Sequence, residues 1–200
     1  MEIDAKMVMA LRQKTGAPMK DCRQALIEAD GDESKAIEVL RKKGLKAGEG
    51  LAGRTASEGL IASYVHHNGR IGVLVELGCE TDFVARNDEF QQFARNLCLH
   101  IAAMRQTRYL DKESVDPAFL ESERKIYTAQ TEEQMKGKPA DVIAKVIDGR
   151  IQKMYSEVCL LEQPWVHDPS LTVGGALKAL AGKIGENLTI RRFHRMELGV

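Results

Sequence analysis

Residues 59–78 hold the feature that most constrains the fold: two runs of alternating apolar residues on either side of Asn68-Gly69. Asn-Gly is the preferred pair for a two-residue type I′ turn, so the two runs are expected to form a β-hairpin. If these two residues form the loop, His67 pairs with Arg70 and the register follows. One face of the hairpin is then almost entirely apolar and is expected to pack on helices. This face carries Leu60, Ala62, Tyr64, His66, Ile71, Val73, Val75 and Leu77.

The stretch Gly78–Asn87 joins this hairpin to a predicted amphipathic helix. That helix has one apolar stripe, made of Phe90, Phe93, Ala94, Leu97, Ile101 and Met104. If Thr81 or Asp82 caps one unbroken helix, Phe83 lies close to the core face. If Asn87 is the main cap, a separate short turn precedes the helix and Phe83 lies outside the stripe. Helix capping alone leaves both orientations of Phe83 open.

Residues 4–44 are expected to form three short helices. Asp4 suits the N-cap of the first helix, and Gly44 is placed to end the third. A bundle of this size is near the lower limit for independent folding, which favours a tethered recognition module. Residues 45–57 contain three glycines among charged side chains and are interpreted as a linker, flexible or partly helical.

The rest of the chain adds helices and one strand to the hairpin. Residues 111–135, 139–155 and 173–184 are predicted helices, and residues 188–198 form an extended stretch that would add a strand. Arginines in that stretch suit a solvated face or edge. The predicted fold class is α+β. It comprises an N-terminal three-helix module at 1–44, a linker at 45–57 and an antiparallel core and dimerisation domain at 58–200.

Composition excludes several kinds of partner. The formal net charge is zero and aromatic residues make up only 5%, which disfavours direct binding to nucleic acid. No run approaches the roughly 18 apolar residues of a membrane span. The start, Met1-Glu2-Ile3-Asp4, is acidic and unlike a signal peptide, so we expect a cytoplasmic protein. None of the four cysteines is in C-x-x-C spacing, and reduced thiols are expected.

Motifs for covalent chemistry are missing from the sequence. The five histidines form no H-E-x-x-H pattern, and Gly182-Lys183 fails the P-loop test because Ile184 follows. Cys79 is next to Glu80, whose carboxylate would disfavour a thiolate nucleophile. We therefore expect no catalytic residue, no metal site and no cofactor. Phe83 beside Asp82 remains as a candidate interface anchor.

Three motifs carry a resemblance to a known family. Cys79-Glu80-Thr81-Asp82-Phe83-Val84-Ala85-Arg86 resembles the signature of bacterial elongation factor Ts, and the likeness runs along the whole chain. A second match combines Thr15-Gly16-Ala17 with Met19, Asp21, Cys22 and Ala25-Leu26. The third is Ile184-Gly185-Glu186-Asn187.

The resemblance implies a guanine nucleotide exchange factor for the GTPase elongation factor Tu. It implies that the N-terminal bundle is ubiquitin-associated-like and docks on the GTPase domain. It also implies that Thr81, Asp82, Phe83 and Val84 dislodge Mg²⁺ and disturb the phosphate site, with Phe83 pointing outward. The short length is similar to that of family members without an inserted coiled-coil hairpin, which tend to be homodimers.

Two other hypotheses stay open from the residues. One is a ubiquitin-associated-like adaptor that binds a protein without exchange activity. The other is a thiol enzyme built on Cys79 and a histidine. The adaptor gives no reason for Asp82-Phe83 at the junction, and the enzyme lacks an oriented base.

Overall fold

The computed structural model describes residues 3–199, so residues 1–2 and 200 of the predicted terminal domains lie outside the described part. The described residues divide into two compact units, neither of which is continuous in sequence. The first unit contains the residues up to Leu60, Gly78–Phe90 and Gly175–Thr189. The second contains Ile61–Leu77, Gln91–Gly174 and the residues from Ile190 onward. The division predicted from sequence at 1–44, 45–57 and 58–200 stays a prediction.

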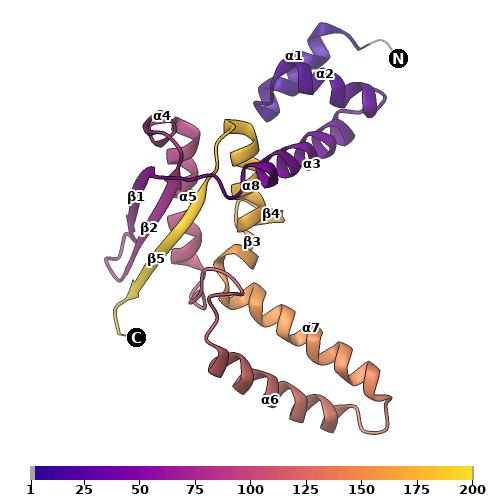
Figure 1. The fold of residues 1–200 in the computed structure, drawn as a ribbon, viewed down its shortest axis with the longest axis vertical. Helices are drawn as coiled ribbons and strands as arrows, with labels where there is room; N and C mark the ends of the chain where they lie inside the picture. The colour runs from indigo at the N-terminus through magenta and orange to yellow at the C-terminus, as the bar shows by residue number, and fades with distance from the viewer. Residues whose placement is uncertain (1–2, 200) are drawn as a thin grey trace. The chain divides into compact units, whose positions relative to one another are not determined.

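The first unit begins with three helices, α1 (Ala5–Thr15), α2 (Met19–Glu28) and α3 (Glu33–Leu51) (Figure 1). Asp4 caps α1 as expected, since its carboxylate accepts the backbone N–H of Met7 at 2.8 Å. Asp32 caps α3 in the same way, on Lys35. The helices enclose a small apolar core of Val8, Leu11, Cys22, Ala25, Leu26, Ala29 and Ala36.

The third helix is longer than predicted, and the expectation that Gly44 ends it is wrong. α3 continues to Leu51, and this part of the predicted linker is helical. Gly48 allows a close approach to α8 (Val173–Ile184), because a Cβ at this position would overlap the carbonyl oxygen of Lys178. Glycine costs helix stability in isolation, but here it lets two backbones come together.

The second unit is built on a sheet. Within residues 3–199, β1 (Glu58–Val65), β2 (Ile71–Cys79) and β5 (Thr189–Glu197) form an antiparallel sheet with β2 in the middle. Val73, Val75 and Leu77 are buried, as the predicted apolar face requires. The expected third strand is thus confirmed at the edge of the hairpin.

The loop between β1 and β2 differs from the prediction. His66 N–H donates to the Ile71 carbonyl at 2.8 Å, which fits the predicted register. The strands stop at Val65 and Ile71, however, and Gly69 N–H closes a turn on His66 at 2.7 Å. Among these loop residues, only Gly69 has a positive φ, whereas a type I′ turn needs two. The two-residue type I′ loop is therefore wrong, and the connection is longer.

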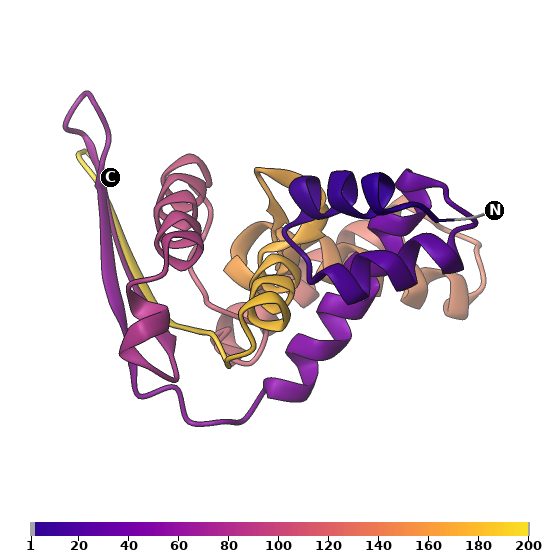
Figure 2. The same ribbon diagram turned by 90° about the horizontal axis from the view of Figure 1, so that it is seen from above.

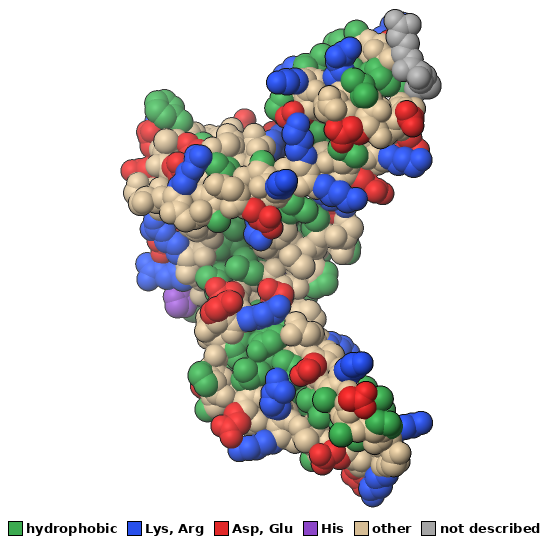
Figure 3. All heavy atoms as spheres, turned by 45° about the vertical axis from the view of Figure 1, so that its right-hand side comes forward, with side chains coloured by type: hydrophobic (Ala, Val, Ile, Leu, Met, Phe, Trp, Pro, Cys, Tyr) green, Lys and Arg blue, Asp and Glu red, His purple; other side chains and the backbone are tan. Residues whose placement is uncertain are grey.

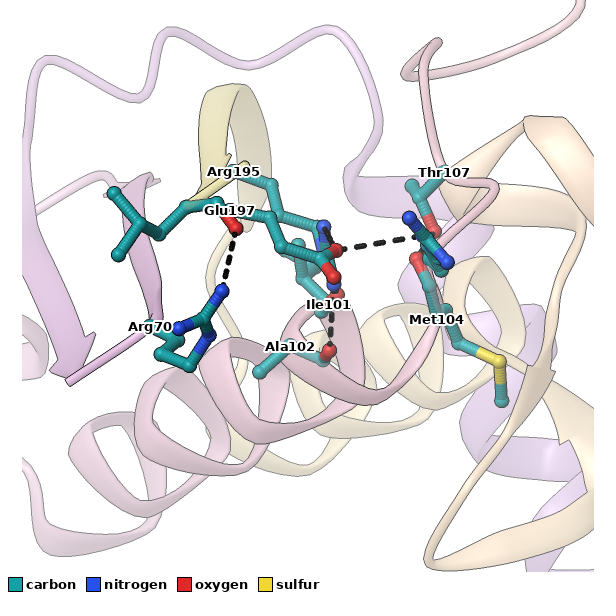
Figure 4. Close-up of polar contacts among 9 residues, drawn as sticks. Arg70, Ile101, Ala102, Met104, Thr107, Arg195 and Glu197 are labelled. Carbon is teal, nitrogen blue, oxygen red and sulfur yellow. Dashed lines mark hydrogen bonds and ion pairs between the residues drawn. The ribbon is translucent and has the colours of Figure 1, made fainter. Parts of the chain in front are cut away.

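One arginine of β5 is not solvated as expected. The Arg195 guanidinium donates to the carbonyls of Ile101 and Ala102, both at 3.2 Å, and pairs with Glu197 at 2.8 Å (Figure 4). These carbonyls belong to the last turn of α5 (Asp88–Ala103), where helical C=O groups have no intrahelical partner. Arg195 therefore acts as a side-chain cap that ties β5 to α5.

α5 lies along one face of the sheet (Figure 2). Its predicted stripe is buried from Phe90 to Ile101, while Met104 follows the end of the helix and is half-buried. The opposite face of the sheet keeps apolar side chains in solvent. Ile61, Val65 and Met196 are each more than 60% exposed there.

Two long helices, α6 (Pro117–Gln134) and α7 (Ala140–Val158), pack together as a helical hairpin. The sequence predicted both helices and the break between them, but the expectation of a chain without such a hairpin is wrong. Arg150 of α7 joins them by donating to Gln130 at 3.2 Å and Gln134 at 2.7 Å. Acidic and basic side chains alternate over the hairpin surface (Figure 3).

A short 3₁₀ helix, η1 (Leu160–Glu162), leads from α7 to a two-stranded ribbon of β3 (Pro164–Trp165) and β4 (Asp168–Thr172). The ribbon was not among the elements predicted from the sequence. α8 follows with the bounds predicted from sequence. In the part of the chain that the structure describes, no helix has the length and apolar character to cross a membrane.

Candidate functional site

The junction after β2 uses both of the helix caps that the sequence offered. A four-residue helix, α4 (Asp82–Ala85), begins after Thr81, whose hydroxyl accepts the backbone N–H of Val84 at 3.4 Å. Asn87 then caps α5 by accepting the N–H groups of Glu89 at 2.8 Å and Phe90 at 3.3 Å. The chain therefore forms a separate short turn before α5, which is the second of the two arrangements considered above.

Phe83 points into solvent from this turn. Its side chain is 81% exposed, the largest fraction among the exposed large hydrophobic residues of the described chain. Phe90, seven positions later, is fully buried. The break at Asn87 explains the contrast, because it takes Phe83 out of the helical period of α5. Aromatic side chains are frequent anchors at protein interfaces, so this exposed ring is a candidate contact for a partner.

The neighbours of Phe83 stabilise the turn. Asp82 accepts from Arg86 at 2.9 Å in an (i, i+4) ion pair on the surface. Val84 is half-buried and offers its backbone N–H to Thr81. The structure thus brings the four predicted site residues together on one capped turn, with Phe83 at its exposed position.

Glu186 and Asn187, which lie far along the sequence, hold this turn by hydrogen bonds. Glu186 accepts the backbone N–H groups of Glu80 and Thr81, both at 3.0 Å, and the Thr81 hydroxyl at 2.6 Å. In return, Glu80 accepts the backbone N–H of Asn187 at 2.6 Å. Asn187 donates its side-chain amide to the Arg54 carbonyl at 2.7 Å. All of these residues belong to the first unit.

Sequence reasoning used Glu186 and Asn187 only as part of a family motif and did not assign them to the site. The neighbouring sequence shows that Gly185 follows a predicted helix and precedes a carboxylate, but it does not show what that carboxylate binds. A pairing across 105 positions, as between Thr81 and Glu186, leaves no periodic trace in the sequence.

Cys79 lies beside the turn but is not a poised nucleophile. It is buried, and its thiol donates to the Thr81 carbonyl at 3.1 Å. Burial raises the pKa of the Cys79 thiol, and the carboxylates of Glu186 and Glu58 raise it further. A reactive thiolate needs the opposite environment, positive and partly exposed. This geometry weighs against the thiol-enzyme hypothesis.

The site therefore contains an exposed aromatic side chain, a surface ion pair and a network of hydrogen bonds that holds the backbone. Between Ile3 and Gly199, no group of three or more His, Cys, Asp or Glu side chains is placed to hold a metal ion. A rigid turn that displays one large apolar side chain is the arrangement of an interaction protein, which acts by contacting another macromolecule.

Comparisons with known proteins identify the family. The chain matches the family described as Elongation factor TS over residues 13–200. It is 52% identical to Elongation factor Ts of Alkaliphilus oremlandii, over 100% of this chain and 90% of that protein. It is 50% identical to Elongation factor Ts of Fervidobacterium nodosum, over the full length of both chains. The chain belongs to the elongation factor Ts family, as its motifs predicted, and is thus a translation elongation factor.

Proposed function

We propose that this protein binds elongation factor Tu carrying GDP and promotes release of the nucleotide. In this proposal it is a guanine nucleotide exchange factor that makes and breaks no covalent bond. Thr81, Asp82, Phe83 and Val84 reach the nucleotide site, dislodge Mg²⁺ and disturb the contacts to the phosphates. The observation that carries the proposal is the 81% exposure of Phe83 on a turn fixed from both sides.

The energy for exchange comes from binding. A GTPase holds its nucleotide through phosphate contacts and a bridging Mg²⁺. If the factor binds the nucleotide-free GTPase more tightly than the GDP form, factor and GDP weaken each other by the same ratio. Burying a Phe side chain contributes about 1.5–3 kcal/mol, and each 1.4 kcal/mol changes an affinity about tenfold. One aromatic wedge can therefore supply a substantial part of the coupling.

The four residues have different roles in this proposal. Phe83 enters the partner and displaces groups that position the metal or the phosphates. Asp82 brings a carboxylate toward the phosphates, where like charges repel. Thr81 and Val84 keep the turn closed through the hydrogen bond between them (3.4 Å). The pair of Asp82 with Arg86 orients that carboxylate before the partner arrives.

The N-terminal helices are proposed as the docking module, ubiquitin-associated-like in shape, for the GTPase domain. They keep several apolar side chains in solvent, among them Met9 at 54% and Ile27 at 45%. Residues of this kind lose water on binding a partner and contribute to affinity. Docking through the helices would bring Phe83 to the nucleotide site at high local concentration.

We also propose a homodimer formed through the outward face of the sheet. Ile61, Val65, Leu74 and Met196 are exposed on the three strands, and their apolar surface would be covered by a second copy. Ile61→Glu tests this: wild type should sediment as a dimer and the variant as a monomer. A wild-type monomer at micromolar concentration, or a dimeric variant, contradicts the proposed interface.

The exchange proposal is tested by the release of a fluorescent GDP from elongation factor Tu in a stopped-flow instrument. Added protein should accelerate release in proportion to its concentration and then reach a plateau. Binding without acceleration would instead favour the ubiquitin-associated-like adaptor. We propose that the protein acts in the cytoplasm without direct contact to nucleic acid, in keeping with its balanced charge.

A further inference from the structure

We propose that Glu186 is a positioning residue for nucleotide exchange, which holds the turn that displays Phe83 in its binding conformation. This inference rests on the exchange function proposed above and extends the machinery beyond residues 81–84. Glu186 itself is half-buried and acts through Thr81 rather than by contacting the nucleotide site.

The Glu186 carboxylate accepts three hydrogen bonds from two consecutive residues. One oxygen accepts the backbone N–H groups of Glu80 and Thr81, and the other accepts the Thr81 hydroxyl. A carboxylate can accept all three because its two oxygens offer about four acceptor positions. Hydrogen bonds to an ionised acceptor are roughly twice as strong as neutral ones. Glu186 is therefore the main anchor of the backbone that precedes α4.

The hydroxyl of Thr81 transmits this anchoring to α4. A hydroxyl has one proton, and in Thr81 that proton is donated to Glu186 at 2.6 Å. The lone pairs of the same oxygen then face the N–H of Val84, which they accept at 3.4 Å. Without Glu186 the hydroxyl would rotate freely and the cap would weaken. A four-residue helix has little stability of its own, so its cap determines whether it stays formed.

The carboxylate is itself held in place by a rigid element. Gly185 has a φ of +88° and its N–H bonds to Ala181 at 2.8 Å, which ends α8 and turns Glu186 toward the junction. The Asn187 N–H donates to Glu80, so the two segments hold each other by reciprocal bonds. This arrangement extends from the buried face of α8 to the turn that carries Phe83.

Holding the turn matters for the action of Phe83, because the free energy of binding includes the cost of ordering mobile groups. A turn that is already in its bound conformation avoids that cost, and more of the burial energy of Phe83 remains for expelling GDP. Loss of Glu186 should therefore weaken coupling to the nucleotide more than it weakens docking.

The test compares Glu186→Ala and Glu186→Gln with Glu89→Gln in stopped-flow GDP release from elongation factor Tu. Glu89 pairs with Lys183 at 2.8 Å in the same unit, so its variant removes an equal charge as a control. We expect Glu186→Ala to lower the plateau rate roughly tenfold or more, from the loss of charge-assisted bonds. Glu186→Gln should fall in between, because an amide oxygen accepts only two bonds. Glu89→Gln should match wild type.

The concentration dependence separates positioning from a general loss of folded protein. A smaller folded fraction raises the factor concentration needed for half the plateau but leaves the plateau unchanged. Positioning predicts a lower plateau at a nearly constant half-saturating concentration. A plateau equal to wild type in Glu186→Ala would overturn the proposal.

A double-mutant cycle tests whether Glu186 acts through Phe83. On the Phe83→Ala background, Glu186→Ala should have almost no further effect on the plateau rate. Effects that multiply would overturn the proposal. Hydrogen exchange of the Glu80, Thr81 and Val84 amides should also be faster in Glu186→Ala, and unchanged protection would count against positioning. This exchange needs no GTPase. If wild type fails to release GDP but the amides respond, the exchange function fails while the structural role of Glu186 stands.

Discussion

Replacing Phe83 by alanine removes the aromatic wedge with little effect on the fold. The side chain is 81% exposed, so its truncation leaves no cavity. Surface substitutions of this kind usually change stability by no more than about 0.5 kcal/mol. The melting temperature and circular dichroism of Phe83→Ala should therefore match those of wild type, which makes any functional loss attributable to the contact.

The magnitude of that loss follows from the surface available for burial. Complete burial of a Phe side chain contributes about 1.5–3 kcal/mol, and nearly all of the Phe83 surface is still exposed in the free protein. If this burial occurs when GDP leaves, the alanine variant should release GDP about ten- to a hundredfold more slowly at saturation. Phe83→Leu keeps part of the apolar surface and should lie between the two.

The assay is stopped-flow release of fluorescent GDP from elongation factor Tu over a series of factor concentrations. Val166→Ala is the matched control, because it shortens an apolar side chain that is 46% exposed in the other unit. It should leave release unchanged. A Phe83→Ala variant that folds normally and still gives the wild-type plateau would refute the wedge.

Two further predictions concern stability. Gly48→Ala should destabilise the protein by about 1–3 kcal/mol, because a methyl group would overlap the Lys178 carbonyl; Gly50→Ala, in open space on the same helix, should gain up to about 1 kcal/mol. Urea denaturation of both variants measures this, and equal effects would show that the close approach does not constrain α3. Burial lowers the pKa of His100, whose Nε2 lies 2.9 Å from Gln163. The His100 imidazole then binds a proton just below about pH 6.5 only in the unfolded chain. The free energy of unfolding should therefore decrease as the pH is lowered through this range, by at most about 1.4 kcal/mol per pH unit. An unchanged pH dependence of the unfolding free energy in His100→Gln would contradict this.

Local patterns predicted most of the secondary structure. The alternation around Asn68-Gly69 gave the buried face of the sheet, and Asp4 capped the first helix as expected. Turn type was less predictable, because the strands can keep their register while a longer loop joins them. Gly44 shows a second limit: glycine ends many helices, but α3 continues past this position to Leu51.

The candidate site was partly predictable, because local sequence patterns determine part of its structure. The turn that carries Phe83 depends on two local caps, both visible in the sequence, and family resemblance chose the outward orientation. The partners of that turn were not predictable, because Glu186 meets Thr81 across 105 positions. The position of Arg195 was also wrongly predicted. Its charge suggested a solvent-exposed side chain, whereas it donates to carbonyls at the end of α5 that have no intrahelical partner.

The central claim is that this protein expels GDP from elongation factor Tu. The most direct measurement is the dissociation rate of labelled GDP from the purified GTPase as wild-type protein is added, with excess unlabelled GDP present. The rate should rise with protein concentration and reach a plateau far above the spontaneous rate. A rate that stays at the spontaneous value, while the two proteins bind each other by calorimetry, would contradict the account.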